Sequence, residues 1–164
     1  MDIDTAMRWL QSAAIPKAIA GNEIIFPWSE SIHVLAIVLV VGTISIVDLR
    51  LLGIASLDRA VKRLMSDVLP LTWGAFGVAA ITGSLLFSSD ALNYSHNFFF
   101  RGKLIFLILA GLNMAFFHLA GIRDVAHWGA ARQTPISAKV AGGVSLLLWI
   151  CVVAFGRGIG FTMH

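Results

Sequence analysis

The segment "SESIHVLAIVLVVGTISIVDLRLLG", residues 29–53, decides the fold. It contains no charged side chain over 31–47, and roughly 17–25 mostly apolar residues are enough to cross a membrane as a helix. His33 interrupts the apolar run near its start, and Asp48 stands at its end. Ionisable residues are costly inside a membrane and are by default candidates for function. The segment therefore predicts a transmembrane helix and two candidate functional residues.

The composition of the whole chain agrees with this interpretation. Of its 164 residues, 58% are hydrophobic and 13% are charged, whereas soluble domains have about 25% charged residues. A chain this short has too little interior to bury so much apolar surface in one water-soluble core. The only cysteine is Cys151, so a disulfide within the chain is excluded. The composition predicts an integral membrane protein in a lipid bilayer.

Three more stretches without charge follow the first one, at 68–89, 104–122 and 140–156. Each is long enough to span a bilayer, and a helix satisfies its own backbone hydrogen bonds in lipid. We therefore expect spans at about 29–53, 68–89, 101–122 and 137–157. The connections leave no room for a soluble domain. The predicted fold is all-α, a single membrane domain over 1–164 built as a four-helix transmembrane bundle.

The N-terminal segment, about 4–19, has the pattern of an amphipathic helix. Met7, Leu10, Ala14 and Ala18 recur at helical intervals, and Pro16 interrupts the pattern. We expect a short helix that lies on the membrane surface. The segment lacks the continuous apolar stretch of a signal peptide, so we expect no cleavage.

The loop charges predict the orientation. Four spans place both termini on one side, here called side A, and the opposite side is called side B. Side A carries five basic residues, which are Arg8, Lys17, Arg101, Lys103 and Arg157. Side B carries seven, which are Arg50, Arg59, Lys62, Arg63, Arg123, Arg132 and Lys139. The positive-inside rule makes side B cytoplasmic, with both termini periplasmic in a bacterial inner membrane. These scattered charges form no patch for nucleic acid.

Two of the five histidines fall inside predicted spans. His33 lies near the side A end of the first span, and His118 lies near the side B end of the third. The two spans run parallel, so the two residues are separated by roughly 24 Å along the membrane normal at a rise of about 1.5 Å per residue. They cannot bind one metal ion within a subunit. We therefore predict two separate sites, one near each face.

A second ligand for each site can come from the loops or from another subunit. His96 lies on side A with His33, and His127 follows His118 by nine residues on side B. Nine residues on an unbroken helix place two side chains on opposite faces, so His127 needs a break in the helix. The small residues along the spans allow helices to approach closely. We expect a homo-oligomer.

The chemistry of imidazole favours haem at these sites. Neutral imidazole leaves water at lower cost than a carboxylate, and its nitrogen is a good axial ligand of haem iron. The chain has no CxxCH attachment motif, so the haem would be non-covalent b-type, with up to two per chain.

Neighbouring residues extend the two predicted sites. Arg101 and Lys103 on side A, and Arg123 and Arg50 on side B, could bind haem propionates. Gly111 lies seven residues before His118, about 20° around the helix, and would give a porphyrin room. Asp48 lies at the depth of His118 and could orient its ring, or it could pair with Arg50 or Arg123.

Two motifs carry a resemblance to a family. The stretches IHVLAIVLVVGTISIVDLRLLG (32–53) and SSDALNYSHNFFFRGKLIFLILAGLNMAFFH (88–118) resemble a group of small four-span bacterial membrane proteins of unassigned function. The resemblance implies the four-helix fold. His33 and His118 fall in the matching motifs, whereas His96 and His127 do not. The first motif also resembles the copper-resistance membrane domain and the di-haem b-type cytochromes, which place histidines at span ends.

Three functions remain open at this point. The leading prediction is a b-type haem-binding protein that transfers electrons, with His33 and His118 as axial ligands. It would act as a membrane oxidoreductase with a quinol or superoxide partner. The first alternative is a copper-handling protein or permease that uses His33, His96 and Met114, since methionine favours Cu(I). The second is a structural accessory subunit without a cofactor, in which the histidines bond between helices.

Overall fold

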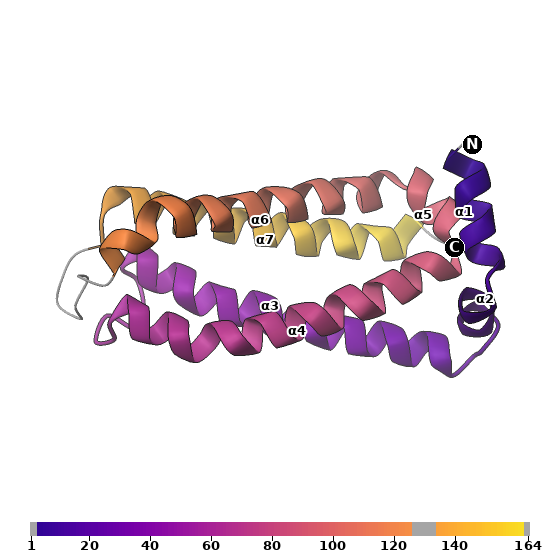
Figure 1. The fold of residues 1–164 in the computed structure, drawn as a ribbon, viewed down its shortest axis with the longest axis horizontal. Helices are drawn as coiled ribbons and strands as arrows, with labels where there is room; N and C mark the ends of the chain where they lie inside the picture. Colours follow the sequence, from indigo (N-terminus) through magenta and orange to yellow (C-terminus); the bar gives the residue numbers. More distant parts are fainter. Residues whose placement is uncertain (1–2, 126–133, 163–164) are drawn as a thin grey trace.

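Four long helices form the body of the protein. The structure is a computed structural model that describes residues 3–125 and 134–162. In these residues it contains helices and turns but no strand, which confirms the predicted all-α class. The long helices lie side by side as an elongated bundle (Figure 1), and they are α3 (Ile25–Leu52), α4 (Val61–Ser89), α6 (Phe98–Val125) and α7 (Ile136–Thr162). Each of them contains a stretch long and apolar enough to cross a membrane. The protein is a multi-pass membrane protein.

Local signals in the sequence set the helix ends. Helix α3 ends at Leu52 because Gly53 adopts a left-handed conformation with φ 78°, which glycine adopts without steric cost. The backbone N–H of Ile54 then donates to the carbonyl of Leu49 over 2.9 Å. Helix α6 begins after Asn97, whose side-chain oxygen accepts a hydrogen bond from the N–H of Phe100 over 3.1 Å. An asparagine in this position satisfies a backbone donor that has no partner within the helix.

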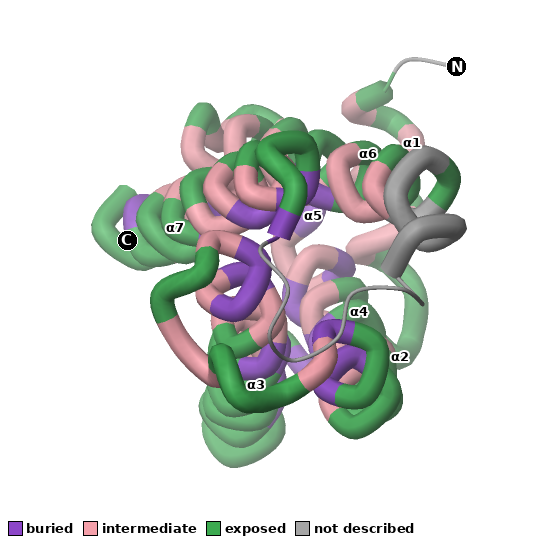
Figure 2. The backbone as a smooth tube through the Cα atoms, turned by 90° about the vertical axis from the view of Figure 1, so that its left-hand side faces the viewer, coloured by how far each residue is buried: buried purple, intermediate pink, exposed green. Residues whose placement is uncertain are grey.

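One apolar core runs through the middle of the bundle. Helix α3 packs along α4 and against α7, and α6 packs along α7. The central cluster contains Val40 of α3, Ala75 of α4, Ala110 of α6, and Trp149 with Val152 of α7. An end view shows the buried residues turned inward and the exposed ones outward (Figure 2). Four helices therefore share one interior.

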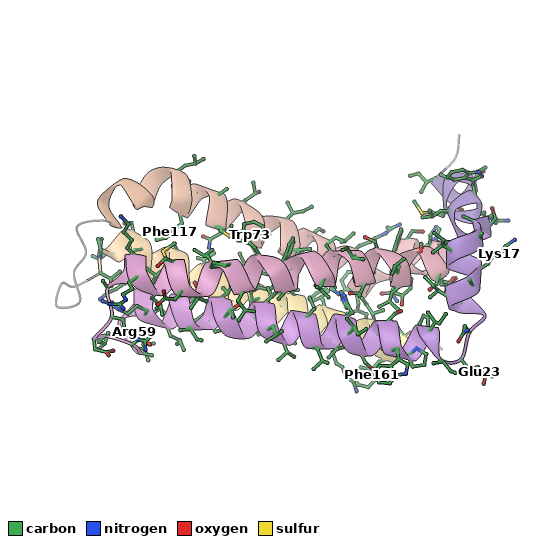
Figure 3. The ribbon with its side chains drawn as sticks, turned by 60° about the horizontal axis from the view of Figure 1, so that its bottom comes forward. Lys17, Glu23, Arg59, Trp73, Phe117 and Phe161 are labelled. Atoms are coloured by element: carbon green, nitrogen blue, oxygen red, sulfur yellow. The ribbon has the colours of Figure 1, made fainter. Side chains whose placement is uncertain are left out.

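The outer faces of the bundle are apolar. Large side chains such as Leu35, Ile81, Ile108 and Leu147 are exposed on them. An apolar surface of this extent suits lipid rather than water. Charged residues stand instead at the ends, as Figure 3 shows for Arg59 at one end and for Lys17 and Glu23 at the other.

Two short helices, α1 (Ile3–Ser12) and α2 (Ala14–Ala20), cover the side A end of the bundle (Figure 1). The helical conformation is interrupted at Ala13, between α1 and α2. Pro16 falls in the first turn of α2, where the missing N–H of proline costs no hydrogen bond. Helix α1 lies against α5 (Ala91–His96), and α2 lies against α4. Gln11 fixes α1 by donating to Asp90 Oδ1 over 3.0 Å.

Two glycines bring α6 and α7 together near side A. A Cβ atom on Gly102 of α6 would lie 2.3 Å from the ring of Phe155 on α7. A Cβ atom on Gly158 of α7 would lie 2.4 Å from the ring of Phe99 on α6. Each helix therefore seats one phenylalanine on a glycine of the other, a close approach that side chains at these positions would prevent.

We predict that Gly102→Ala destabilises the protein by about 1–3 kcal/mol, because the added methyl group displaces the Phe155 ring. Thermal unfolding in detergent measures this effect. The matched control is Gly111→Ala on the same helix, where a Cβ atom would meet nothing within 4 Å. Equal unfolding temperatures for the two variants would show that the contact between Gly102 and the Phe155 ring is not tight.

Candidate functional site

His33 lies against α4 in the side A half of the bundle. Its Nδ1 is 3.1 Å from Oγ1 of Thr82. The Thr82 hydroxyl donates its own hydrogen to the carbonyl of Val78 over 2.7 Å, so its oxygen accepts from the ring. This network assigns the hydrogen of the imidazole to Nδ1. Nε2 then carries the free lone pair.

Gly83 makes room for the His33 ring. A Cβ atom at this position would lie 2.9 Å from Cε1 of His33, so the ring rests on the backbone of α4. Neither Thr82 nor Gly83 was predicted from the sequence as a partner of His33. The sequence does contain a signal for this contact. A threonine followed by a glycine, Thr82 and Gly83, stands near the side A end of the next span, at the depth of His33.

Lys103 of α6 is the cation of this region. It is half-buried, and its charge acts on His33. Gly156 of α7 lies beside it, since a Cβ atom there would be 3.8 Å from the lysine Nζ, an ordinary van der Waals distance. Among the described residues, no carboxylate forms an ion pair with Lys103. His33, Thr82, Lys103 and Gly156 thus gather one residue from each long helix, and we call them the side A site.

His96 and Arg101 hold the bundle end rather than the side A site. Nδ1 of His96 is 3.0 Å from the carbonyl of Leu92, and Nε2 is 3.5 Å from Asp4 Oδ1 on α1. Arg101 donates from Nε to the carbonyl of Ser95 over 2.7 Å. None of these contacts involves His33. His96 therefore links α5 to α1, and Arg101 links α6 to α5.

Asp48 and Arg50 are both buried near side B, with exposed fractions of 5% and 2%. Arg50 donates from Nε to the carbonyl of Arg59 over 2.8 Å, and its Nη1 lies 3.5 Å from Oγ1 of Thr134. The arginine therefore ties the end of α3 to the α3–α4 loop and to Thr134, two residues before α7. It forms no ion pair with Asp48.

The other predicted residues fall outside this arrangement. His118 and Arg123 belong to α6, but their side chains lie outside the described part, as does the whole of His127. Gly111 is exposed, and a Cβ atom there would meet nothing within 4 Å, so it faces outward from the bundle. Over the residues that the structure describes, no group of three or more His, Cys, Asp or Glu side chains is placed to hold a metal ion.

One family matches the chain over residues 7–162, and it is described as a family of unknown function (DUF6644). The chain belongs to this family. The match confirms the resemblance to an uncharacterised family, whereas the likeness to di-haem cytochromes and to the copper-resistance domain stays a prediction. No curated protein and no solved structure matches the chain.

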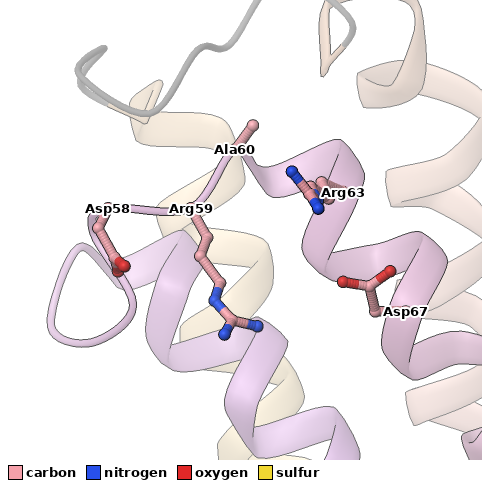
Figure 4. A pocket seen from close by; sticks show the side chains of 5 residues that line it. All are labelled: Asp58, Arg59, Ala60, Arg63 and Asp67. Atoms are coloured by element: carbon pink, nitrogen blue, oxygen red, sulfur yellow. The ribbon is translucent and has the colours of Figure 1, made fainter.

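Within this member of the DUF6644 family, a surface pocket opens at the α3–α4 loop on side B. It has a volume of about 590 Å³ and is lined by Asp58, Arg59, Ala60, Arg63 and Asp67. Figure 4 shows two basic and two acidic side chains around it. The pocket contains none of the predicted ligands, and the side A site lies in the opposite half of the bundle.

Tyr94 packs at the side A end of the bundle, beside Phe87 and Phe100. Its ring centroid is 6.2 Å from that of Phe87 and 5.4 Å from that of Phe100. Burial, and next the nearby charges of Glu30 and Asp90, raise the pKa of the Tyr94 hydroxyl above its usual value. The packed state therefore favours the neutral phenol.

We predict that this packing weakens in alkaline solution. A folded-state pKa above the unfolded value of about 10 means that stability is complete below pH 10 and is lost as the pH rises through the folded pKa. Tyr94 is the single tyrosine of the chain, so tyrosinate absorbance reports it alone. Titration of the folded protein at the same pH as the denatured protein would contradict this prediction.

We also predict that Thr82→Val destabilises the protein by about 0.5–1.5 kcal/mol, because His33 loses its hydrogen bond to the Thr82 hydroxyl and keeps only the one to the backbone carbonyl of Ala79. Thr82→Ser keeps the hydroxyl and should unfold close to the parent. Thermal unfolding in detergent compares the two variants. A Thr82→Val variant that unfolds at the parent temperature would show that this hydrogen bond does not stabilise the protein.

Proposed function

We propose that this protein is a b-type haem-binding membrane protein that transfers electrons, with His33 as an axial ligand near side A. The observation that supports the proposal is the hydrogen bond between Nδ1 of His33 and the hydroxyl of Thr82. Histidines that bind metals donate their other ring N–H to an acceptor, which fixes the ring and raises the basicity of the coordinating nitrogen. His33 has this arrangement, with Nε2 left to coordinate.

The charge of the side A site supports the same proposal. Lys103 comes close to His33 without an ion-pair partner among the described residues. A cation in a region of low dielectric constant favours a ligand that brings negative charge. Haem carries two propionate groups, and Lys103 would bind one of them. When bound, the haem supplies the one-electron chemistry.

Further parts of the proposal rest on the sequence. A second haem would bind at His118 near side B, and a neighbouring subunit would complete the coordination. We therefore propose a homo-oligomer in a bacterial inner membrane, with both termini periplasmic. The redox partner would be a quinol or superoxide.

Absorption spectroscopy of the purified full chain tests the proposal. We expect a Soret band that shifts when dithionite is added, and we expect His33→Ala to lose about half of the haem or more. His96→Ala is the matched control, because both ring nitrogens of His96 face groups at the bundle end. A colourless protein without iron would end the proposal.

Two glycines on α4 sharpen the assignment of the ligand. Gly83→Ala should lower the haem content as His33→Ala does, because its methyl group would displace the ring. Gly77→Ala should not, because a Cβ atom there would meet nothing within 4 Å. Stoichiometric copper in place of iron would favour the copper-handling alternative, and neither metal would favour the structural subunit.

A further inference from the structure

The carboxyl group of Asp48 is a buried polar group of α3 that lacks a complete set of hydrogen bonds. The residue is 5% exposed, and its Oδ2 is buried without a hydrogen-bond partner among the described residues. Asp48 precedes the end of α3 at Leu52 by four residues, which is about 6 Å along the helix axis. The group therefore lies just inside the side B end of a membrane-spanning helix.

Helix α7 encloses this carboxyl group from one side. A Cβ atom on Gly142 would lie 3.1 Å from the backbone oxygen of Asp48, so α7 presses directly on this turn of α3. Ser145, one turn further along α7, faces the Asp48 carboxyl with its hydroxyl. A hydroxyl can donate one hydrogen bond, so Ser145 leaves the second carboxylate oxygen without a donor.

Apolar side chains surround the same turn of α3. Val47 and Leu51 belong to a cluster with Met65 of α4 and Ala138 of α7. Phe117 of α6 packs on this cluster as well. Asp48 is therefore almost fully enclosed next to this apolar packing.

The charged side chains that the structure describes near Asp48 do not give it a cation partner. Arg50 directs its guanidinium to Arg59 and Thr134. At this end of the bundle, the other charged residues of α4 and α7 are Lys62, Arg63 and Asp67, which are exposed, and Lys139 of α7. On α6 the titratable residues at this end are His118, Arg123 and Asp124, whose side chains lie outside the described part. Among the described residues, no cation lies within ion-pair distance of Asp48.

We propose that Asp48 is a proton-binding site of this membrane protein. An ionised carboxylate in such surroundings carries a large desolvation cost. A proton taken up from side B converts the carboxylate to a neutral acid, so the charge at this position changes from −1 to 0. The proton leaves by the same route. This site is independent of haem at His33, which lies in the opposite half of α3.

Labelling with dicyclohexylcarbodiimide tests the proposal on the intact chain in lipid vesicles. This apolar reagent adds to the protonated form of a carboxyl group in apolar surroundings, and the modified peptide is identified by mass spectrometry. We expect labelling of Asp48 at neutral pH, with less as the pH is raised. Asp67 serves as the exposed control carboxyl and should stay unlabelled. An unlabelled Asp48 would overturn the proposal.

Two substitutions give a second measurement. Asp48→Asn imitates the neutral acid, so we expect it to unfold at the parent temperature and to keep any bound haem. Asp48→Glu keeps the titratable group and should still be labelled. If Asp48 instead acts as an anion that orients His118, Asp48→Asn loses haem and the parent stays unlabelled, which overturns the proposal. A colourless protein would end the haem proposal and leave the labelling result unaffected.

Discussion

Close contact between helix backbones is the constraint on which this structure depends. In lipid, apolar side chains gain little by moving from lipid tails to a neighbouring helix, so association relies on van der Waals packing and on hydrogen bonds between helices. Glycine permits that packing. Gly102 and Gly158 bring α6 to α7, and Gly142 brings α7 to α3.

The same device forms the two functional candidates. Gly83 lets the ring of His33 rest on α4, and Gly142 lets α7 enclose Asp48. A methyl group at either position would meet the candidate residue itself. The helix contacts that assemble the bundle therefore also decide the surroundings of His33 and Asp48 on α3.

Some polar groups inside the bundle form hydrogen bonds to another helix. The Thr72 hydroxyl of α4 lies 2.8 Å from the Thr43 hydroxyl of α3, and Asn113 of α6 donates to the carbonyl of Ala141 on α7 over 3.0 Å. His33 forms a hydrogen bond with Thr82. Asp48 is different because its Oδ2 has no hydrogen-bond partner among the described residues. Burying a carboxyl group without its hydrogen bonds costs free energy. For this reason Asp48 is the candidate functional residue of the side B half.

The sequence by itself determined the four spans, because the length and composition of a membrane helix are imposed by the bilayer and are local properties. It also predicted that His33 and Asp48 belong to opposite faces of the membrane, since both stand on one helix. Only the tertiary structure decided their neighbours. The rotation and packing of the helices bring Thr82, Gly83 and Lys103 close to His33. They also direct the Arg50 guanidinium to the α3–α4 loop instead of to Asp48. Those depend on contacts between segments distant in the chain, which no single apolar run encodes.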